Sequence, residues 1–135
     1  MWAILSAVFA AATAIFAKIG VAGIDANFAT AVRTSIVVVF TWLIALCFGS
    51  PLSIHSASIK TWVFLTLSGL GTGLSWICYF HALQVGQATR VAPVDKLSVA
   101  LVIVFGTVFL QERLTWGKGI GALLIVAGAI AVTLD

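Results

Sequence analysis

Long runs of apolar residues make up most of the chain, and short polar segments separate them. A bilayer core about 30 Å thick needs roughly 20 apolar residues to be crossed by a helix, and five runs reach that length. The run Ile36–Phe40 shows none of the alternation that strands of a membrane barrel require. The pattern therefore predicts an all-α integral membrane protein, one domain over residues 1–135 with five transmembrane helices. The predicted helices are Trp2–Gly20, Phe28–Gly49, Thr61–Leu83, Val91–Gln111 and Trp116–Leu134.

The segments between the runs contain residues that start and stop helices. Asp25 or Asn27 is placed to cap the second helix, and Thr115 to cap the fifth. Pro93 is expected in the first turn of the fourth helix, where a missing N–H does no harm. The longest polar loop runs from Ser53 to Lys60. The first helix is not expected to be a cleaved signal, because it lacks a charged start and four more helices follow.

Composition supports a membrane protein. Hydrophobic residues make up 62% of the chain and charged residues only 8%, and the mean hydropathy is +1.22. Soluble domains average about 25% charged residues, and disordered chains are poor in apolar residues. The net charge of +3 is scattered, so we expect no nucleic-acid partner. Cys47 and Cys78 lack metal-ligand spacing and are interpreted as small buried hydrophobes, so no metal or cofactor is expected.

The cations are divided almost evenly between the two faces of the membrane. Topology normally follows a Lys/Arg excess on the cytoplasmic face. We call the face that holds the N-terminus side A and the opposite face side B. The chain has either one weakly determined orientation, aided by a partner, or a dual topology with copies inserted both ways. Side A is predicted to hold Lys60, Arg113 and Lys118, and side B to hold Lys18, Arg33, Arg90 and Lys96.

Three charged residues fall inside predicted helices and are candidates for solute binding. Arg33 lies in the second helix, and Asp95 and Lys96 lie in the fourth. Intramembrane charges usually face a partner or a wet cavity. Neighbouring residues diverge by about 100° on a helix, so Asp95 and Lys96 should not share a face, and one of them is free to pair with Arg33. The alternative is structural: Asp95 complements a helix N-terminus and the cations reach the headgroups.

The third predicted helix is the most polar. A stripe of hydroxyls with aromatic neighbours suits a moderately polar solute. The alternative is that the hydroxyls bond to carbonyls of their own helix. His81 is interpreted as an interfacial residue rather than a proton relay. The stripe consists of Ser68, Thr72, Ser75 and Tyr79, and beside it lie Gly69, Gly73, Trp76 and Phe80. The candidate solute-binding residues from this helix are Thr72, Ser75, Trp76 and Tyr79.

Glycines at helical spacing are predicted to serve helix packing. Small residues let helix backbones approach closely in a membrane. Glu112 is expected at the membrane interface after the fourth helix. No Ser–His–Asp set, paired catalytic carboxylates, HExxH motif or phosphate loop is present, so we do not expect an enzyme. The predicted packing glycines are Gly69 and Gly73 in the third helix and Gly117, Gly121 and Gly128 in the fifth.

Two segments and the glycine-rich last helix carry a family resemblance. The segments are Val91-Ala-Pro-Val-Asp-Lys-Leu-Ser-Val and Phe105-Gly-Thr-Val-Phe-Leu-Gln-Glu-Arg-Leu-Thr. The chain resembles the EamA-type domain of the drug/metabolite transporter superfamily over essentially its whole length. Ile15–Lys18 and Arg33 also fit this pattern, whereas Ala11-Ala12 replaces the tryptophan-glycine often found in the first helix.

The resemblance implies an assembly of two such domains. Most members of the superfamily resemble two fused five-helix halves that are inverted relative to one another, which permits alternating access. This chain supplies one half. We therefore expect an inverted, antiparallel homodimer of ten helices, in which cations of side B attract an anionic or zwitterionic solute. The cations expected there are Lys18, Arg33, Arg90 and Lys96.

The leading interpretation is an exporter or facilitator of a small, amino-acid-like metabolite in the bacterial inner membrane. Small multidrug resistance relatives rely on a glutamate in the first helix, and this first helix has no carboxylate. Proton coupling would have to use Asp95, His81 or Glu112. The alternatives are a non-transporting subunit of a larger complex and a lipid-linked sugar flippase, and an integral-membrane enzyme has the least support.

Overall fold

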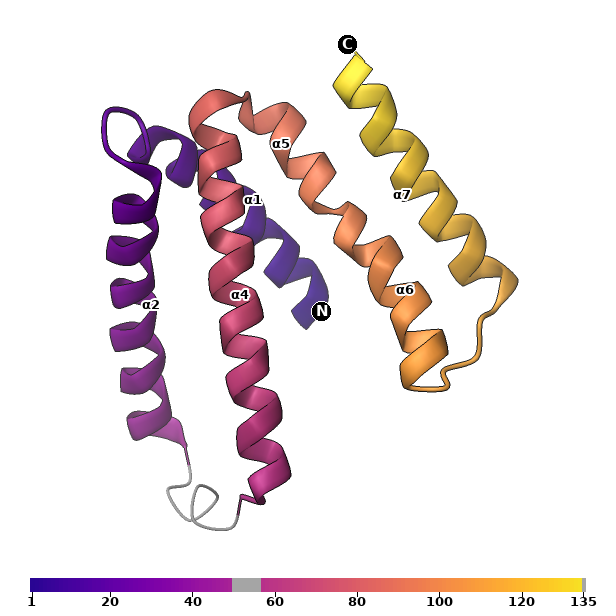
Figure 1. The fold of residues 1–135 in the computed structure, drawn as a ribbon, viewed down its shortest axis with the longest axis horizontal. Coiled ribbons are helices and arrows are strands. Elements are labelled where there is room, and N and C mark those ends of the chain that lie inside the picture. The colour runs from indigo at the N-terminus through magenta and orange to yellow at the C-terminus, as the bar shows by residue number, and fades with distance from the viewer. Residues whose placement is uncertain (50–56, 135) are drawn as a thin grey trace. The chain divides into compact units, whose positions relative to one another are not determined.

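The computed structural model describes residues 1–49 and 57–134, and all regular structure in these residues is helical. Five segments are long and apolar enough to cross a membrane, which confirms the predicted number of spans. The fourth span, Ala88–Phe109, consists of two consecutive helices. The helices are α1 (Trp2–Gly20), α2 (Ala26–Phe48), α4 (Ile59–Val85), α5 (Ala88–Asp95), α6 (Leu97–Phe109) and α7 (Trp116–Leu134) (Figure 1).

The start of α2 follows from a capping side chain. Asp25 Oδ1 accepts hydrogen bonds from the backbone N–H groups of Asn27, at 2.9 Å, and Phe28, at 3.1 Å. Asp25 is therefore the N-cap, and α2 begins at Ala26, two residues before the predicted start. The predicted loop from Ser53 lies largely outside the described residues, which resume at position 57.

The fourth span differs from the prediction. It begins at Ala88 instead of Val91, so Pro93 is the sixth residue of α5 and does not lie in the first turn. Proline has no N–H to donate to the preceding turn. The helix stops at Asp95, and the N–H of Lys96 is shared between the carbonyls of Ala92 and Pro93, at 3.3 and 3.1 Å. The span is therefore interrupted at Lys96, close to Pro93.

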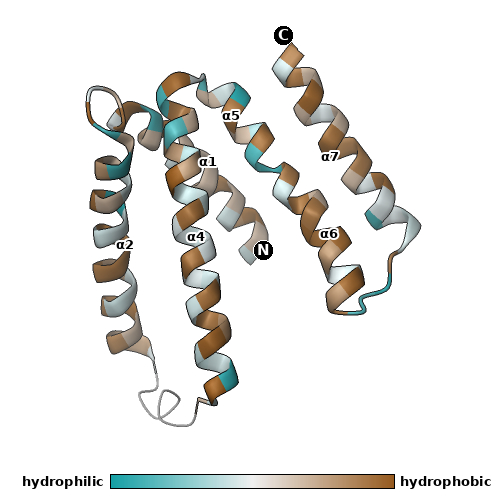
Figure 2. Cartoon of the chain, viewed as in Figure 1, coloured by the Kyte–Doolittle hydropathy of each residue, from teal (hydrophilic) through white to brown (hydrophobic). Residues whose placement is uncertain are grey.

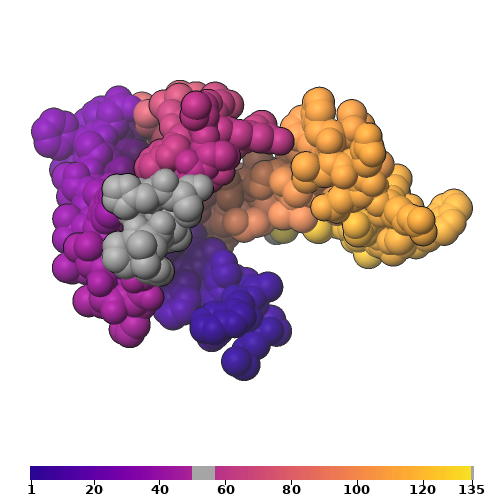
Figure 3. Space-filling model, turned by 90° about the horizontal axis from the view of Figure 1, so that it is seen from below, coloured from indigo at the N-terminus to yellow at the C-terminus, as the bar shows by residue number. Residues whose placement is uncertain are grey.

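The chain divides into two compact units, which we describe separately. Unit 1 contains residues 1–16 and the residues from 85 onward, and unit 2 contains residues 17–84. In unit 1, α5, α6 and α7 pack against one another. Gly106 on α6 and Ala129 on α7 are buried. The space-filling view shows the residues of the α6–α7 connection, in orange, gathered together (Figure 3).

Unit 2 has a small core where α1 ends, α2 begins and α4 ends. Leu83 and Val21 are almost completely buried, with 0% and 1% of their surfaces exposed. Small residues around them let the three helix ends approach closely. The buried residues of this core are Ala17, Val21, Ala26, Ala29, Thr30, Phe80 and Leu83.

Outside these cores, the described helices present apolar side chains on most of their surface. Figure 2 shows hydrophobic residues, in brown, along every helix. Phe40 on α2, Leu65 on α4 and Leu123 on α7 are each more than 60% exposed. Such a surface is unfavourable in water and favourable in lipid. The chain is an integral, multi-pass membrane protein.

Candidate functional site

The guanidinium group of Arg33 packs over two aromatic rings of α4. Arg33 is the eighth residue of α2, so it lies about 10 Å along the helix from its start. The guanidinium carbon of Arg33 lies 4.0 Å from the ring centroid of Trp76 and 5.7 Å from that of Phe80. Both distances fall within the range of cation–π attraction, about 6 Å. The aromatic rings of α4 therefore hold this cation inside the span.

Tyr79 extends the aromatic group around Arg33. Its ring meets that of Phe80 edge to face, with centroids 6.5 Å apart, and the side chain interacts electrostatically with Arg33. Arg33, Trp76 and Tyr79 are half-buried. Among the described residues, no carboxylate forms an ion pair with Arg33. Arg33 is therefore a positively charged group, covered by rings, whose charge no described residue neutralises. We call Arg33, Trp76, Tyr79 and Phe80 the arginine–aromatic cluster.

Polar contacts at the helix ends hold the core of unit 2 next to this cluster. Lys18 Nζ donates to the carbonyl of Leu83 at 2.5 Å, and Gln84 Nε2 donates to the carbonyl of Ile24 at 2.9 Å. His81 Nε2 lies 3.4 Å from Asn27 Oδ1. Lys18 therefore stabilises the last turn of α4, where a cation is favourable. The expected contribution of Lys18 to the group of solute-attracting cations stays a prediction.

The hydroxyl stripe of α4 is used partly within its own helix. Thr72 Oγ1 donates to the carbonyl of Ser68 at 2.9 Å, which is the alternative that the sequence left open for this stripe. Thr72 and Ser75 are exposed. Trp76 and Tyr79 are thus the predicted residues of this helix that the structure brings to Arg33, and solute binding by Thr72 and Ser75 stays a prediction.

Asp95 and Lys96 form an ion pair in unit 1. Lys96 Nζ donates to Asp95 Oδ2 at 3.0 Å. The two residues were expected on different faces of the helix, and Lys96 does keep a helical backbone conformation (φ −72°, ψ −8°). The ion pair was not predicted, and it forms because the long lysine side chain reaches the carboxylate of the preceding residue. Pairing of either residue with Arg33 stays a prediction, since Arg33 belongs to the other unit.

A second ion pair lies at the connection between α6 and α7. Lys118 Nζ lies 3.3 Å from Glu112 Oε2, and the N–H of Glu112 donates to the carbonyl of Gly106 at 3.1 Å.

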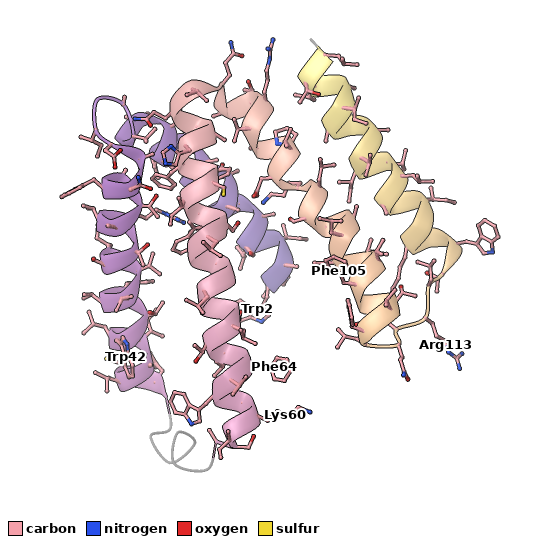
Figure 4. The ribbon with its side chains drawn as sticks, viewed as in Figure 1. Trp2, Trp42, Lys60, Phe64, Phe105 and Arg113 are labelled. Carbon is pink, nitrogen blue, oxygen red and sulfur yellow. The ribbon has the colours of Figure 1, made fainter. Side chains whose placement is uncertain are left out.

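The connection between α6 and α7 contains a tight turn and a helix cap. Gln111 turns the chain with a φ of 54°. Thr115 Oγ1 accepts a hydrogen bond from the N–H of Lys118 at 3.4 Å, as its predicted capping role requires. Arg113 extends away from α6 and α7 (Figure 4). The ion pair of Glu112 and Lys118 borders an apolar groove with a volume of about 390 Å³, which is also lined by Val102, Phe105 and Phe109.

The glycines predicted to pack have open space around them. Apart from their neighbours in the chain and the nearby backbone of their own helix, no heavy atom of the described residues lies within 4 Å of where their Cβ atoms would be, so their packing role stays a prediction. They are Gly69, Gly73, Gly117, Gly121 and Gly128. Cys47 and Cys78 are free and exposed, which corrects the expectation that they are buried. The described residues contain no group of three or more His, Cys, Asp or Glu placed to hold a metal ion.

Phe80 was placed beside the hydroxyl stripe but not among the candidate solute-binding residues, and the contact between Lys18 and Leu83 was not predicted. The distance of each residue from the end of its helix could have predicted the arginine–aromatic cluster. Arg33 lies seven residues after the start of α2, and Trp76 and Phe80 lie nine and five residues before the end of α4. The start of α2 and the end of α4 meet in one core, so these residues lie at similar depths.

Known proteins match nearly the whole chain. Residues 1–134 match the EamA-like transporter family. A Sinorhizobium protein named an uncharacterized transporter in the cobO 3′ region is 47% identical over 133 residues, covering 98% of this chain and 94% of that protein. An uncharacterized protein of Methanocaldococcus jannaschii is 29% identical over 76 residues, 56% of each chain. No solved structure matches. Five segments of the described residues are long and apolar enough to span a membrane. The chain therefore belongs to the EamA-like transporter family.

Proposed function

We propose that the chain transports a small anionic or zwitterionic metabolite and that two copies, inserted in opposite orientations, form the transporter. The observation that carries the solute class is Arg33, a half-buried cation inside a membrane span that contacts Trp76 and Phe80 and no described carboxylate. Intramembrane charges generally face a partner or a wet cavity. A carboxylate or phosphate group of a solute provides the missing counter-charge.

The arginine–aromatic cluster supplies two kinds of contact to such a solute. The guanidinium binds planar anions through paired N–H groups, and the rings of Trp76 and Tyr79 offer apolar area beside it. Thr72 and Ser75 lie on the same helix and add hydroxyls for orientation. Asp95 and Lys96, which belong to unit 1, are also proposed to bind solute.

The even distribution of cations supports the inverted homodimer. Arg90 lies with Lys18 on side B, and Arg113 and Lys118 lie with Lys60 on side A, so neither face has the excess that sets a single orientation. The Sinorhizobium relative is matched over 94% of its own length, so it too has the length of about one five-helix domain. Two inverted copies would place a solute site near the midplane and open it alternately to each face. The relative's bacterial source supports the bacterial inner membrane as the location.

Cysteine labelling from each side of sealed vesicles tests the dual topology. Cys47 and Cys78 are first replaced by alanine, and a single cysteine is then introduced at Leu114 or Gln87. Leu114 is 59% exposed, and the side chain of Gln87 makes no capping hydrogen bond. A membrane-impermeant maleimide should label part of each population from outside, and the remainder only after the membrane is opened. Complete labelling of one variant from outside, with none of the other, would establish one orientation and contradict the homodimer.

A thermal-shift screen of carboxylate and phosphate metabolites tests the solute class. A solute that binds the folded protein raises its melting temperature. The shift should be lost in Arg33→Met and kept in the control Arg113→Met, because Arg113 is exposed, is predicted on side A and makes no ion pair with any described residue. Recovery of the chain only together with another protein would favour a non-transporting subunit instead.

A further inference from the structure

The interruption between α5 and α6 places an ion pair inside a membrane span whose other charged residue is Arg90, near the start of α5. Asp95 and Lys96 are the eighth and ninth of the 22 residues in Ala88–Phe109, so they lie about 10 to 12 Å along the helix from its start. Lys96 Nζ lies 3.0 Å from Asp95 Oδ2. Charged side chains inside a membrane span usually face a partner or a wet cavity, and they often belong to solute or ion pathways.

No other described charge of unit 1 forms an ion pair with Asp95 or Lys96, and Arg113 lies in the connection beyond the other end of α6. Arg90 on α5 lies five residues before Asp95, a spacing that places it on a different face of the helix. The helix α6 has no titratable residue, and α7, which packs against α5 and α6, has only Lys118, in its first turn. Residues 2–16 of α1 also lack a titratable side chain. Lys118 already pairs with Glu112 beyond the other end of α6. Within the unit, Asp95 and Lys96 neutralise each other.

We propose that Asp95 and Lys96 form an exchange site at which one proton and one solute anion bind together. When Asp95 is ionised, its carboxylate forms an ion pair with the ammonium group of Lys96. When a proton binds to a carboxylate oxygen of Asp95, Lys96 is left as an unpaired cation within the span. A lone charge in that position is unfavourable, and a solute anion relieves it by taking the place of the carboxylate.

The exchange keeps the charge of the site constant. The empty site contains one carboxylate and one ammonium, and the loaded site contains a neutral carboxylic acid, one ammonium and one monovalent anion. Proton binding and anion binding must then strengthen each other by the same factor. This inference rests on the transport function proposed above, and it specifies that function as cotransport of a proton with an anion.

NMR of the lysine ammonium groups tests the exchange directly. The full chain is labelled with ¹⁵N at lysine Nζ and placed in nanodiscs of neutral lipid. Methanesulfonate serves as the probe because it stays anionic at mildly acidic pH. Lys96 is assigned from the signal that disappears in Lys96→Arg. The signals of Lys18 and Lys118, which bond to Leu83 and Glu112, report whether Asp95→Asn remains folded. For Glu112→Gln, the signal of Lys18 serves this purpose.

The expected result is a pH-dependent response of Lys96. In the range where the free site stays ionised, the affinity of Lys96 for methanesulfonate should rise about tenfold for each unit of falling pH, because one proton binds with each anion. In Asp95→Asn, which mimics the protonated site, the anion should bind tightly at neutral pH with no pH dependence. The matched control is Glu112→Gln, which frees Lys118 at an exposed pair and should give no comparable gain.

Three outcomes would overturn the exchange site. They are an affinity of Lys96 that does not change with pH, no gain in Asp95→Asn, and an equal gain at Lys118 in Glu112→Gln, which would indicate generic anion binding. Cysteine labelling of the same preparation separates this test from the proposed function. A Lys96 that fails to respond in a dual-topology protein overturns the exchange site alone, whereas a normal response in a singly oriented protein overturns the inverted dimer alone.

Discussion

The contact between Arg33 and Trp76 predicts a measurable coupling energy within unit 2. The guanidinium carbon lies 4.0 Å from the Trp76 ring centroid, and both side chains are half-buried. Cation–π pairs contribute about 0.5–1 kcal/mol when exposed and about 2 kcal/mol when desolvated, so we expect an intermediate coupling of about 1–2 kcal/mol. The contact to Phe80, at 5.7 Å, should contribute less.

A double-mutant cycle isolates this energy from the other effects of each substitution. Arg33→Met, Trp76→Leu and the double variant are compared with the parent protein, and the free energy of unfolding is measured in bicelles by steric trapping. Trp76→Leu also loses buried apolar area, whether or not Arg33 is present. This loss occurs in both the single and the double variant, so it cancels in the cycle. The double variant should be more stable than the sum of the two losses by about 1–2 kcal/mol.

The control cycle pairs Trp76→Leu with Arg90→Met. Arg90 belongs to the other unit and contacts no ring among the described residues, so these two changes should be additive within about 0.5 kcal/mol. A coupling below about 0.3 kcal/mol for Arg33 and Trp76, or an equal coupling for Arg90, would refute the cation–π account of how Arg33 is held.

Three further changes test other contacts by the same unfolding measurement. Asp25→Ala should lower stability by about 1 kcal/mol through loss of the cap of α2, and Asp25→Asn by less; equal losses would argue against the cap. Lys18→Met should lower stability by about 1–2 kcal/mol, because the carbonyl of Leu83 loses a charged donor, and an unchanged stability would contradict that bond. Glu112→Gln should cost less than about 1 kcal/mol since its ion pair is exposed, and a larger loss would show that the pair is shielded from solvent.

The number of spans could be predicted from the sequence because lipid demands long apolar helices. The bounds of α1 and α7 agree with the prediction, and Asp25 caps α2 as its side chain allows. The fourth span was less predictable. A proline is compatible with either the first turn or an interrupted helix, and the start at Ala88 decides between them in favour of the interruption.

The contacts of the site were harder to predict because these helices are apolar on most sides. A helix in water has one apolar stripe that shows which face is buried, but α2 and α4 expose apolar residues such as Phe40 and Leu65 to lipid. The sequence therefore does not show how α2 is rotated about its own axis, and so it does not show that Arg33 faces Trp76. Similarly, the pairing of Asp95 with Lys96 depends on the conformation of the long lysine side chain, which the spacing of the two residues does not specify.

Assembly of chains with fixed orientation tests the inverted homodimer most directly. Leu114→Lys with Arg90→Gln moves positive charge to side A, and a second variant with Ala22→Lys, Gln87→Lys and Lys60→Gln moves it to side B. The account predicts that each variant alone is monomeric in native mass spectrometry of membrane extracts, and that coexpression yields dimers with one copy of each. A stable dimer of either variant alone, or a coexpressed pair that stays monomeric, would contradict it.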